Sequence, residues 1–347
     1  MAFREAASWW NGGLEAAIAV STRSRIVRNI AGMPFPSRLN ADDREAVVSI
    51  AGEAIEKSGM FGPTGVRCSV ASVSPIERRI LVERTLLRSS AGEADVHLWV
   101  SADETIAVAV NDDDHLRIGA TTAGADAAFA YQRTLEHERL LETTIPFSFD
   151  PTHGFHATSA SDVGTGLRLS VMVHVPLLIW EQKAALEKLL TAIVRSGGVI
   201  SGMRGHKSRS IGDIIEISNQ STLGVSEREI VDNARTFIRK IIRAETKARE
   251  DALKKDRALI EDRVWRSLAT LRAARSITYL ETTAFLSWIR VGAHMGIISV
   301  PMALITMALF TTQKAHLCRE HAALVPKAGR DIIRADRMRA LFAPYGG

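Results

Sequence analysis

Four arginines in this chain have spacings that suit phosphate binding. Arg23 and Arg25 alternate in the segment STRSR, Arg117 follows three aspartates, and Arg168 belongs to the alternating segment LRLSVMVHV. Alternate side chains of an extended strand share a face, so we expect Arg23 and Arg25 to point the same way. Guanidinium groups stay charged and bind phosphate oxygens through paired hydrogen bonds. Together they would hold a polyphosphate and stabilise a transferring phosphoryl group, although each one alone is also typical of a surface ion pair.

The elements that must position these arginines are predicted as strands of an antiparallel sheet. Segment Leu167–Val175 alternates, with Arg168, Ser170, Met172 and His174 on one face and apolar residues on the other. A strand with one apolar face and one polar face is typical of a sheet whose open side meets a ligand. Residues 104–110 read as another strand, and residues 43–57 read as a helix.

The last third of the chain is predicted to be helical. Ser226 and Glu229 form a capping box ahead of an apolar-periodic run, and residues 225–291 contain no glycine or proline. We therefore expect an α+β domain over residues 1–245, with an antiparallel sheet flanked by helices. An all-helical domain over residues 246–347 follows it.

Composition excludes several classes of protein. The 347 residues carry a net charge of +5, which is typical of a mixed solvated surface, and no nucleic-acid partner is expected. Cys68 and Cys318 have no metal-ligand spacing, so no metal site is expected among the side chains. The uncharged stretch between Arg290 and Lys314 is broken by polar residues and by Pro301, which favours two buried helices over a membrane span. We expect a cytoplasmic protein.

Seven segments occur in an order that resembles the ATP:guanido phosphotransferase family. The segment STRSRIVRN is similar to the family's opening S-S/T-R-x-R-x-x-R-N, and four further segments follow at family-like distances. The C-terminal segments EDRVWRS and RDIIRA are similar to those of the protein-arginine kinases within that family. The segments in order are STRSRIVRN, ERRILVERTLL, VNDDDHLRI, VGTGLRLSVMVHVP, ISNQSTLGVSE, and EDRVWRS with RDIIRA.

The resemblance implies transfer of a phosphoryl group from ATP, bound with Mg²⁺, to the guanidinium of an arginine in a protein substrate. It implies phosphate-binding roles for a set of residues around the arginines, with Arg204 as a replacement for a missing one. That set is Ser21, Thr22, Arg23, Ser24, Arg25, Arg117, Arg168 and Arg204. The family aims two glutamates at the acceptor guanidinium, to orient it and to take up a proton.

The departures from the family pattern fall in this implied site. Asp113 stands at the first catalytic glutamate, His206 at the second, and Ser201 at a phosphate-binding arginine. The family's C-P-T-N motif aligns with Ser159–Asp162, so serine replaces its reactive cysteine. A nucleotide-contacting histidine aligns with Thr85. An aspartate is one methylene shorter than a glutamate, and a misplacement near 1 Å can cost about a hundredfold in rate.

The segment RDIIRA keeps the pattern that the resemblance assigns to phosphoarginine binding. Asp331 could accept hydrogen bonds from a guanidinium moiety, while Arg330 and Arg334 could meet its phosphoryl group. The same spacing is also that of an ordinary charged helix. The resemblance further implies protein partners: a substrate or phosphoarginine-bearing protein, a Clp-type protease, a kinase activator, or a second copy in a homodimer.

Two functions follow as hypotheses. The first is a protein-arginine kinase of weakened activity that uses Asp113 and a rearranged loop around His206. The second is an inactive pseudokinase that binds phosphoarginine and regulates a kinase or protease complex.

Overall fold

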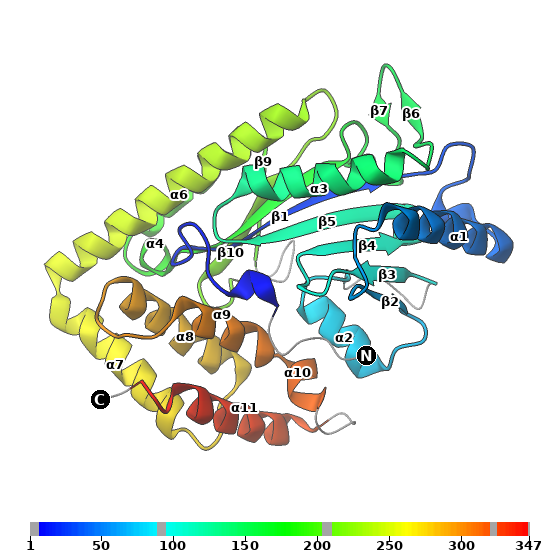
Figure 1. Cartoon of the computed structure of the whole chain (residues 1–347). Coiled ribbons are helices and arrows are strands. Elements are labelled where there is room, and N and C mark those ends of the chain that lie inside the picture. The colour runs from blue at the N-terminus through cyan, green and yellow to red at the C-terminus, as the bar shows by residue number, and fades with distance from the viewer. Residues whose placement is uncertain (1–6, 89–94, 203–209, 320–324, 346–347) are drawn as a thin grey trace.

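A computed structural model describes residues 7–88, 95–202, 210–319 and 325–345. Its centre is an eight-stranded antiparallel sheet in the order β2-β3-β4-β5-β1-β8-β10-β9 (Figure 1). A short hairpin, β6–β7, stands apart from it. The strands are β1 (Ala19–Arg28), β2 (Val66–Ser69), β3 (His97–Val100), β4 (Ile106–Val110), β5 (Leu116–Ala123), β6 (Phe149–Asp150), β7 (Gly154–Phe155), β8 (Leu167–His174), β9 (Gly198–Gly202) and β10 (Ile214–Asn219).

Helices cover both sides of the sheet. In Figure 1, α1, α3 and α6 run along its upper side, whereas α2 and the C-terminal helices lie below it. This confirms the predicted fold class, an antiparallel sheet flanked by helices with a helical C-terminal region. The helices are α1 (Ala41–Ser58), α2 (Pro75–Glu83), α3 (Ala127–Glu142), α4 (Pro176–Trp180), α5 (Lys183–Arg195), α6 (Glu227–Lys255), α7 (Arg257–Ala273), α8 (Tyr279–His294), α9 (Met302–Thr311), α10 (Lys314–Cys318) and α11 (Lys327–Phe342), with 3-10 turns η1 (Ser8–Trp10) and η2 (Pro36–Arg38).

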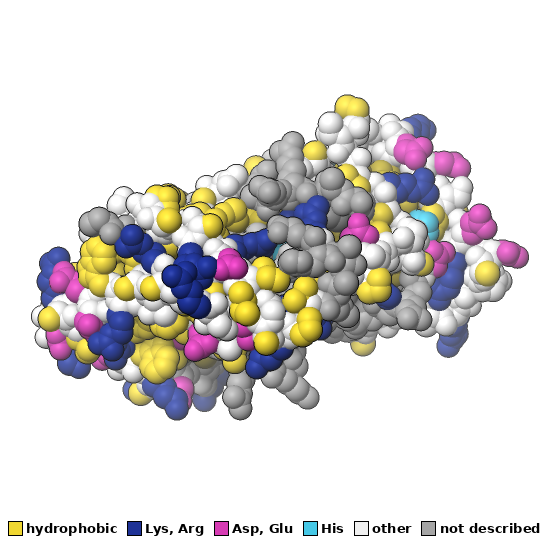
Figure 2. Space-filling model, turned by 90° about the horizontal axis from the view of Figure 1, so that it is seen from below, with side chains coloured by type: hydrophobic (Ala, Val, Ile, Leu, Met, Phe, Trp, Pro, Cys, Tyr) yellow, Lys and Arg dark blue, Asp and Glu magenta, His cyan; other side chains and the backbone are white. Residues whose placement is uncertain are grey.

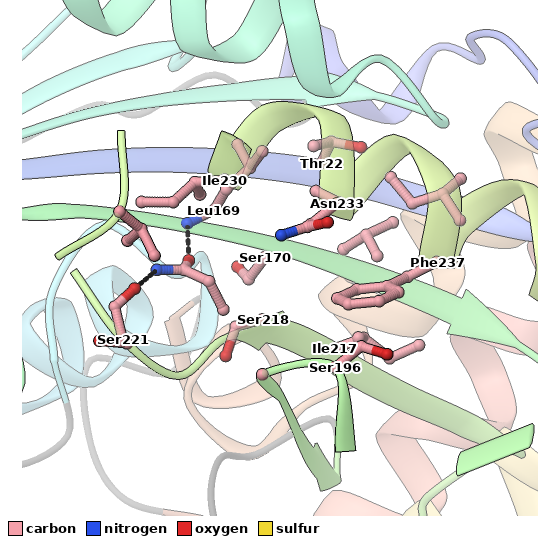
Figure 3. A pocket seen from close by; sticks show the side chains of 16 residues that line it. Thr22, Leu169, Ser170, Ser196, Ile217, Ser218, Ser221, Ile230, Asn233 and Phe237 are labelled. Carbon is pink, nitrogen blue, oxygen red and sulfur yellow. Dashed lines mark hydrogen bonds between the residues drawn. The ribbon is translucent and has the colours of Figure 1, made fainter. Parts of the chain in front are cut away.

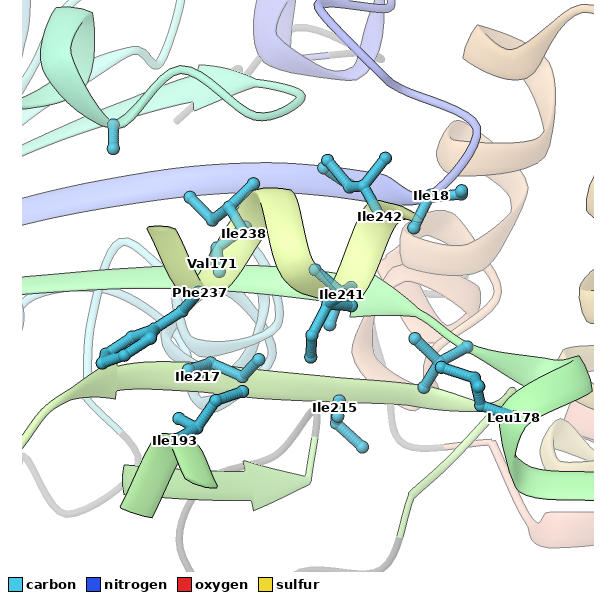
Figure 4. Close-up of a cluster of buried hydrophobic side chains, with 14 of the residues drawn as sticks. Ile18, Val171, Leu178, Ile193, Ile215, Ile217, Phe237, Ile238, Ile241 and Ile242 are labelled. Atoms are coloured by element: carbon cyan, nitrogen blue, oxygen red, sulfur yellow. The ribbon is translucent and has the colours of Figure 1, made fainter. Parts of the chain in front are cut away.

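Helix α6 begins where the capping box predicts and supplies much of the main core. Ser226 accepts a hydrogen bond from the amide of Glu229, whose carboxylate accepts one in return from the amide of Ser226. Because apolar residues recur at helical spacing, one stripe of α6 turns toward the sheet. Figure 4 shows Phe237, Ile238 and Ile241 of this stripe beside Val171 and Ile217 of β8 and β10.

Helix α6 runs unbroken through the predicted domain boundary at residue 245 and ends at Lys255, where Asp256 caps α7. The uncharged stretch between Arg290 and Lys314 is divided between the end of α8 and the separate helix α9. In the described residues, no helix is long and apolar enough to cross a membrane. The division into domains at residue 245 stays a prediction.

A buried polar network joins the sheet to α6 and α8. His174 at the end of β8 accepts a hydrogen bond at Nδ1 from Arg249 (2.9 Å), and its Nε2 lies 2.8 Å from the Ser287 hydroxyl. Arg249 also binds Glu245 at 2.8 Å, one turn earlier on α6. Since a buried polar group must be satisfied, this network fixes how the helical region sits on the sheet.

Candidate functional site

The sheet brings the four predicted arginines to one face. Arg25 of β1 lies opposite Arg168 of β8, and Arg23 lies two residues away on the same strand. Arg117 of β5 lies opposite Val27, so it shares this parity. Directly opposed residues of antiparallel strands point to the same side. We call Arg23, Arg25, Arg117 and Arg168 the arginine cluster.

Each member of the arginine cluster has a carboxylate partner. Arg117 binds Asp112 at 2.7 Å, Arg23 lies 3.4 Å from Glu216, and Asp162 contacts both Arg25 and Arg168. The carboxylate of Asp162 lies 3.8 Å from Arg25 and 2.9 Å from Arg168. Asp112, Asp162 and Glu216 are therefore functional-site residues that the sequence reasoning did not single out.

The electrostatics of the cluster favour an added anion. Burial, and then the charge of Arg117, lower the pKa of Arg25 to about 9, while Asp162 opposes the change. Burial also lowers the pKa of Arg117, which Asp112 counteracts. A guanidinium that is destabilised by burial and by its neighbours gains from an anionic ligand. The Nε of Arg168 is buried and has no hydrogen-bond partner among the described residues.

A small cavity of about 20 Å³ opens beside the cluster. Arg23, Arg25 and Arg117 line it, together with small residues of β4 and β5 that leave space. Thr85 and Glu104 form part of its wall, and both have left-handed backbone angles, with φ of 62° and 59°. Non-glycine residues in this region carry strain, which is typical of binding sites. A cavity of this size has room for about one water molecule.

The wall of this cavity is tied to the helical region. Arg84 is buried, pairs with Glu104 and lies over the Trp10 ring, and its Nε donates to His316 on α10 at 3.2 Å. Burial raises the pKa of the Glu104 carboxyl, and Arg84 opposes that rise. Next to them, Glu83 accepts from the Ala315 amide at 3.0 Å. The start of α10 is thus seated directly behind Thr85.

The three aspartates before Arg117 have separate contacts. Asp112 binds Arg117, as described above. Asp114 is buried and accepts hydrogen bonds from the Asn29 side chain and the Thr158 amide, both at 2.7 Å. Asp113 is about half exposed and pairs with Arg88. It is the aspartate of this turn that an incoming substrate could reach.

Several predicted site residues lie elsewhere. Thr22 and Ser24 have the opposite parity to Arg23, and both are fully buried under the helices. The Thr22 hydroxyl donates to the Gly124 carbonyl at 2.6 Å. Figure 3 shows Thr22 in the wall of a separate, largely apolar cavity between the sheet and α6. The side chains of Thr22 and Ser24 therefore do not join the arginine cluster, whereas Ser21 shares its parity and is buried.

Strand β9 ends at Gly202, and residues 203–209 of the loop after it lie outside the described residues. Ser201 lies opposite Glu216 in β10, the residue that pairs with Arg23, so the position is on the cluster's face. His206 and Arg204 lie outside the described residues. Ser159 is exposed, and its hydroxyl contacts that of Ser161 at 2.8 Å.

The RDIIRA segment is on α11, which packs on α7, α9 and α10. Arg334 is buried and donates to the carbonyls of Thr312 (3.0 Å) and Ile277 (2.9 Å), and to Asp331 at 2.6 Å. Arg330 is partly buried and donates to the Val325 carbonyl at 2.5 Å. Arg334 is therefore used to hold α11 in place, which leaves Arg330 and Asp331 as the more accessible pair.

The described surface mixes both signs of charge. Figure 2, which views the molecule from below, shows Lys and Arg side chains interspersed with acidic and apolar ones. In the described residues, no group of three His, Cys, Asp or Glu side chains could hold a metal ion.

Two family models match the sequence. The model described as the C-terminal catalytic domain of ATP:guanido phosphotransferase matches residues 47–248, and that of the C-terminal domain of protein-arginine kinase McsB matches residues 257–345. A protein-arginine kinase of Pelotomaculum thermopropionicum is 34% identical over 95% of this chain and 94% of its own length. Another, of Symbiobacterium thermophilum, is 33% identical over 97% of both chains.

Two solved structures share the fold. Lombricine kinase has a TM-score of 0.59 and 22% identity, over 74% of this chain and 72% of its own. The duplicated taurocyamine kinase of Schistosoma mansoni has a TM-score of 0.59 and 23% identity. That match covers 67% of this chain but 33% of the longer, duplicated one.

Proposed function

The chain belongs to the ATP:guanido phosphotransferase family, and on that premise we propose that it transfers the γ-phosphoryl group of ATP to arginine side chains of proteins, at a weakened rate. The observation that carries the proposal is the arginine cluster, which three adjacent strands build on one face beside a cavity. Fixed guanidinium groups suit a triphosphate and the charge that develops during transfer.

In the proposed reaction, the bond between the γ-phosphorus and the oxygen bridging to the β-phosphate breaks. A bond from the same phosphorus to a guanidinium nitrogen of the substrate forms, and that nitrogen loses a proton. ADP, phosphoarginine and the proton are the products. Asp113, which is half exposed near the cluster, is the described carboxylate that we assign to orienting the guanidinium and accepting the proton.

Three features account for a weakened rate. Asp113 is shorter than a glutamate, and its carboxylate is already paired with Arg88. Ser201 occupies a position on the cluster's face without supplying a cation. Rate depends steeply on such positioning, so each feature lowers turnover, and the cation missing at Ser201 also weakens nucleotide binding.

The donors on this face suit Mg²⁺ that arrives with the nucleotide. The described part of the chain offers no three-ligand cluster, and Mg²⁺ is commonly held by substrate phosphates, waters and one or two carboxylates. When bound, the ion would neutralise phosphate charge. The arginine cluster would position the phosphate oxygens that face the protein.

A second candidate is a pseudokinase that binds phosphoarginine. The ion pair between Asp113 and Arg88 favours this candidate, because it occupies the carboxylate that catalysis would need. In that case the partners would be phosphoarginine-bearing proteins, or a protease or kinase that the chain regulates. ATP, Mg²⁺, a cytoplasmic location and a homodimer belong to the proposal in either form.

Phosphoarginine-specific mass spectrometry separates the two candidates. The wild-type protein is incubated with MgATP and an arginine-rich protein, beside Asp113→Asn and the control Arg228→Ala. Arg228 is on α6, and its side chain is 93% exposed. We expect a low yield of phosphoarginine, unchanged in the control and reduced by about a hundredfold in Asp113→Asn. If Asp113→Asn forms phosphoarginine as well as the wild type does, the role assigned to Asp113 is wrong. If the wild type forms no phosphoarginine, the pseudokinase is favoured.

A further inference from the structure

Asp162 has an unusual place in the arginine cluster, because its two carboxylate oxygens contact two different strands. Oδ1 accepts from Nη2 of Arg168 at 2.9 Å, and Oδ2 lies 3.8 Å from Nη2 of Arg25. Arg25 and Arg168 are directly opposed in β1 and β8. Two oxygens that bridge two guanidinium groups have the arrangement that two oxygens of one phosphate would have.

The loop around Asp162 is held by contacts that do not involve a ligand. The buried Thr222 hydroxyl donates to the carbonyls on both sides of Asp162, those of Ser161 at 2.9 Å and Val163 at 2.7 Å. Gly164 has φ of 108°, and a Cβ there would lie 2.3 Å from the Thr222 carbonyl oxygen. The chain must therefore pass close to Thr222, and the carboxylate is fixed against the two arginines.

The negative charge of Asp162 lowers the net positive charge that the arginine cluster offers to an anion. The four arginines of the cluster face three carboxylates, those of Asp112, Asp162 and Glu216, which leaves a formal charge of +1. Among these three, Asp162 contacts two cluster arginines and its side chain is 8% exposed. The C-P-T-N motif of the family has a neutral asparagine at the aligned position. With an amide there, the same face would have a formal charge of +2.

We propose that the Asp162 carboxylate acts as a built-in competitor for nucleotide phosphate, which must displace it from Arg25 and Arg168 in order to bind. Asp162 is then a specificity-determining residue that weakens nucleotide affinity in this chain. The proposal rests on the proposed nucleotide site at the arginine cluster. It is separate from the losses at Ser201 and Asp113, because it concerns an added negative charge.

Calorimetric titration of the full chain with MgADP tests this, since ADP avoids turnover. Asp162→Asn keeps the size and one acceptor oxygen but removes the charge. The control Asp232→Asn makes the same change in net charge on α6, where Asp232 is 58% exposed. We expect Asp162→Asn to lower the Kd about tenfold and the control to leave it unchanged.

Thermal unfolding provides a second measurement. Without nucleotide, Asp162→Asn is expected to lower Tm because two arginines lose a counter-charge. At one fixed MgADP concentration, the rise in Tm is expected to be larger than for the wild type. Asp162→Ser has the same expected direction and replaces Asp162→Asn if the amide variant does not fold.

The outcomes separate this proposal from the proposed function. If the wild type binds MgADP and Asp162→Asn binds it equally well or more weakly, the proposed role of Asp162 is wrong. The proposed nucleotide site would remain. This outcome includes a case in which Asp162 contributes to turnover but not to affinity. Absence of binding by both proteins at millimolar MgADP would overturn both.

Discussion

At the scale of single residues, the turn between β4 and β5 shows what chemistry the chain retains. Asp112 pairs with Arg117, and Asp114 accepts hydrogen bonds from Asn29 and Thr158. Of the three aspartates, only Asp113 is exposed enough to contact a substrate. A shortened carboxylate with an arginine neighbour can still accept a proton. It does so from a poorer position than a glutamate would have.

Restoring the family residues together should recover activity. The combined variant Ser201→Arg, His206→Glu and Asp113→Glu is expected to raise the initial rate of arginine phosphorylation by at least about a hundredfold. Ser201 lies opposite Glu216, so an arginine there would add a cation to the cluster's face. Initial rates measured by phosphoarginine formation check this, with Ser201→Arg alone as the comparison. A wild-type rate equal to that of the triple variant would refute the weakened-site account.

Residue types and spacing were enough to predict the arginines but not their counter-ions. Alternation in β1 places Arg23 and Arg25 together, and the motif order adds Arg117 and Arg168. Asp162 is six residues before Arg168, and Glu216 is far along the chain from Arg23. Such pairings depend on strand register, which a single sequence does not specify.

At the scale of elements, strand parity divides the side chains of the STRSR segment between two faces of the sheet. The resemblance implied that Ser21–Arg25 acts as one phosphate-binding segment. In β1, alternate residues face the helices instead, and Thr22 and Ser24 are buried there. By contrast, the start of α6 was predicted correctly, because a capping box is a local signal. The predicted open face of β8 is wrong beyond Arg168, because Ser170, Met172 and His174 are buried.

Within the RDIIRA segment of α11, Arg334 and Arg330 are expected to contribute differently to stability. Arg334→Ala is expected to lower the free energy of unfolding by about 3 kcal/mol, because buried carbonyls of Thr312 and Ile277 lose their donor. Arg330→Ala, whose side chain is only partly buried, is expected to cost less than about 1 kcal/mol. Denaturant unfolding of both variants measures this.

The variants Asp331→Ala and Arg330→Ala test ligand recognition by the full chain. We expect NMR titration to show tighter binding of phosphoarginine than of phosphate or arginine. Asp331→Ala should remove the preference for phosphoarginine over phosphate, whereas Arg330→Ala should weaken both. Equal shifts for phosphate and phosphoarginine that Asp331→Ala leaves untouched would make α11 an ordinary charged helix.

At the scale of the whole molecule, buried polar contacts connect the sheet to the helical region at two places. One is the His174–Arg249 network, and the other is the seat of α10 on Glu83 behind the cavity. The partners are far apart in sequence, so these contacts could not be predicted from local patterns. They mean that a change in the helical region can reach the wall of the cavity beside the arginine cluster.

Buried His174 should make stability depend on pH. Burial, and then the charge of Arg249, lower its pKa well below the usual value, and the Nδ1 atom accepts from Arg249. Below about pH 6.5 the unfolded chain binds a proton at this residue that the folded chain does not. The free energy of unfolding therefore falls as pH decreases, by about 1.4 kcal/mol per pH unit for this histidine. Burial also lowers the pKa of His115, His137, His294 and His316, which adds to the slope.

Denaturant unfolding between pH 6.5 and 5 checks this with His174→Asn. Asparagine can accept from Arg249 but cannot be protonated in this range. The free energy of unfolding of His174→Asn should fall less steeply with decreasing pH than that of the wild type, by about 1.4 kcal/mol per pH unit. Identical slopes would mean that His174 does not titrate differently in the folded and unfolded states.

If the arginine cluster binds nucleotide, a calorimetric titration with MgATP will show binding that depends on its arginines. The wild type, Arg25→Ala and the exposed control Arg228→Ala are compared at one ionic strength. We predict weak but measurable binding by the wild type and the control, and a Kd at least about tenfold higher in Arg25→Ala, whose buried guanidinium would lose its phosphate contact. No heat from the wild type at millimolar MgATP, or equal binding in Arg25→Ala, would contradict the account.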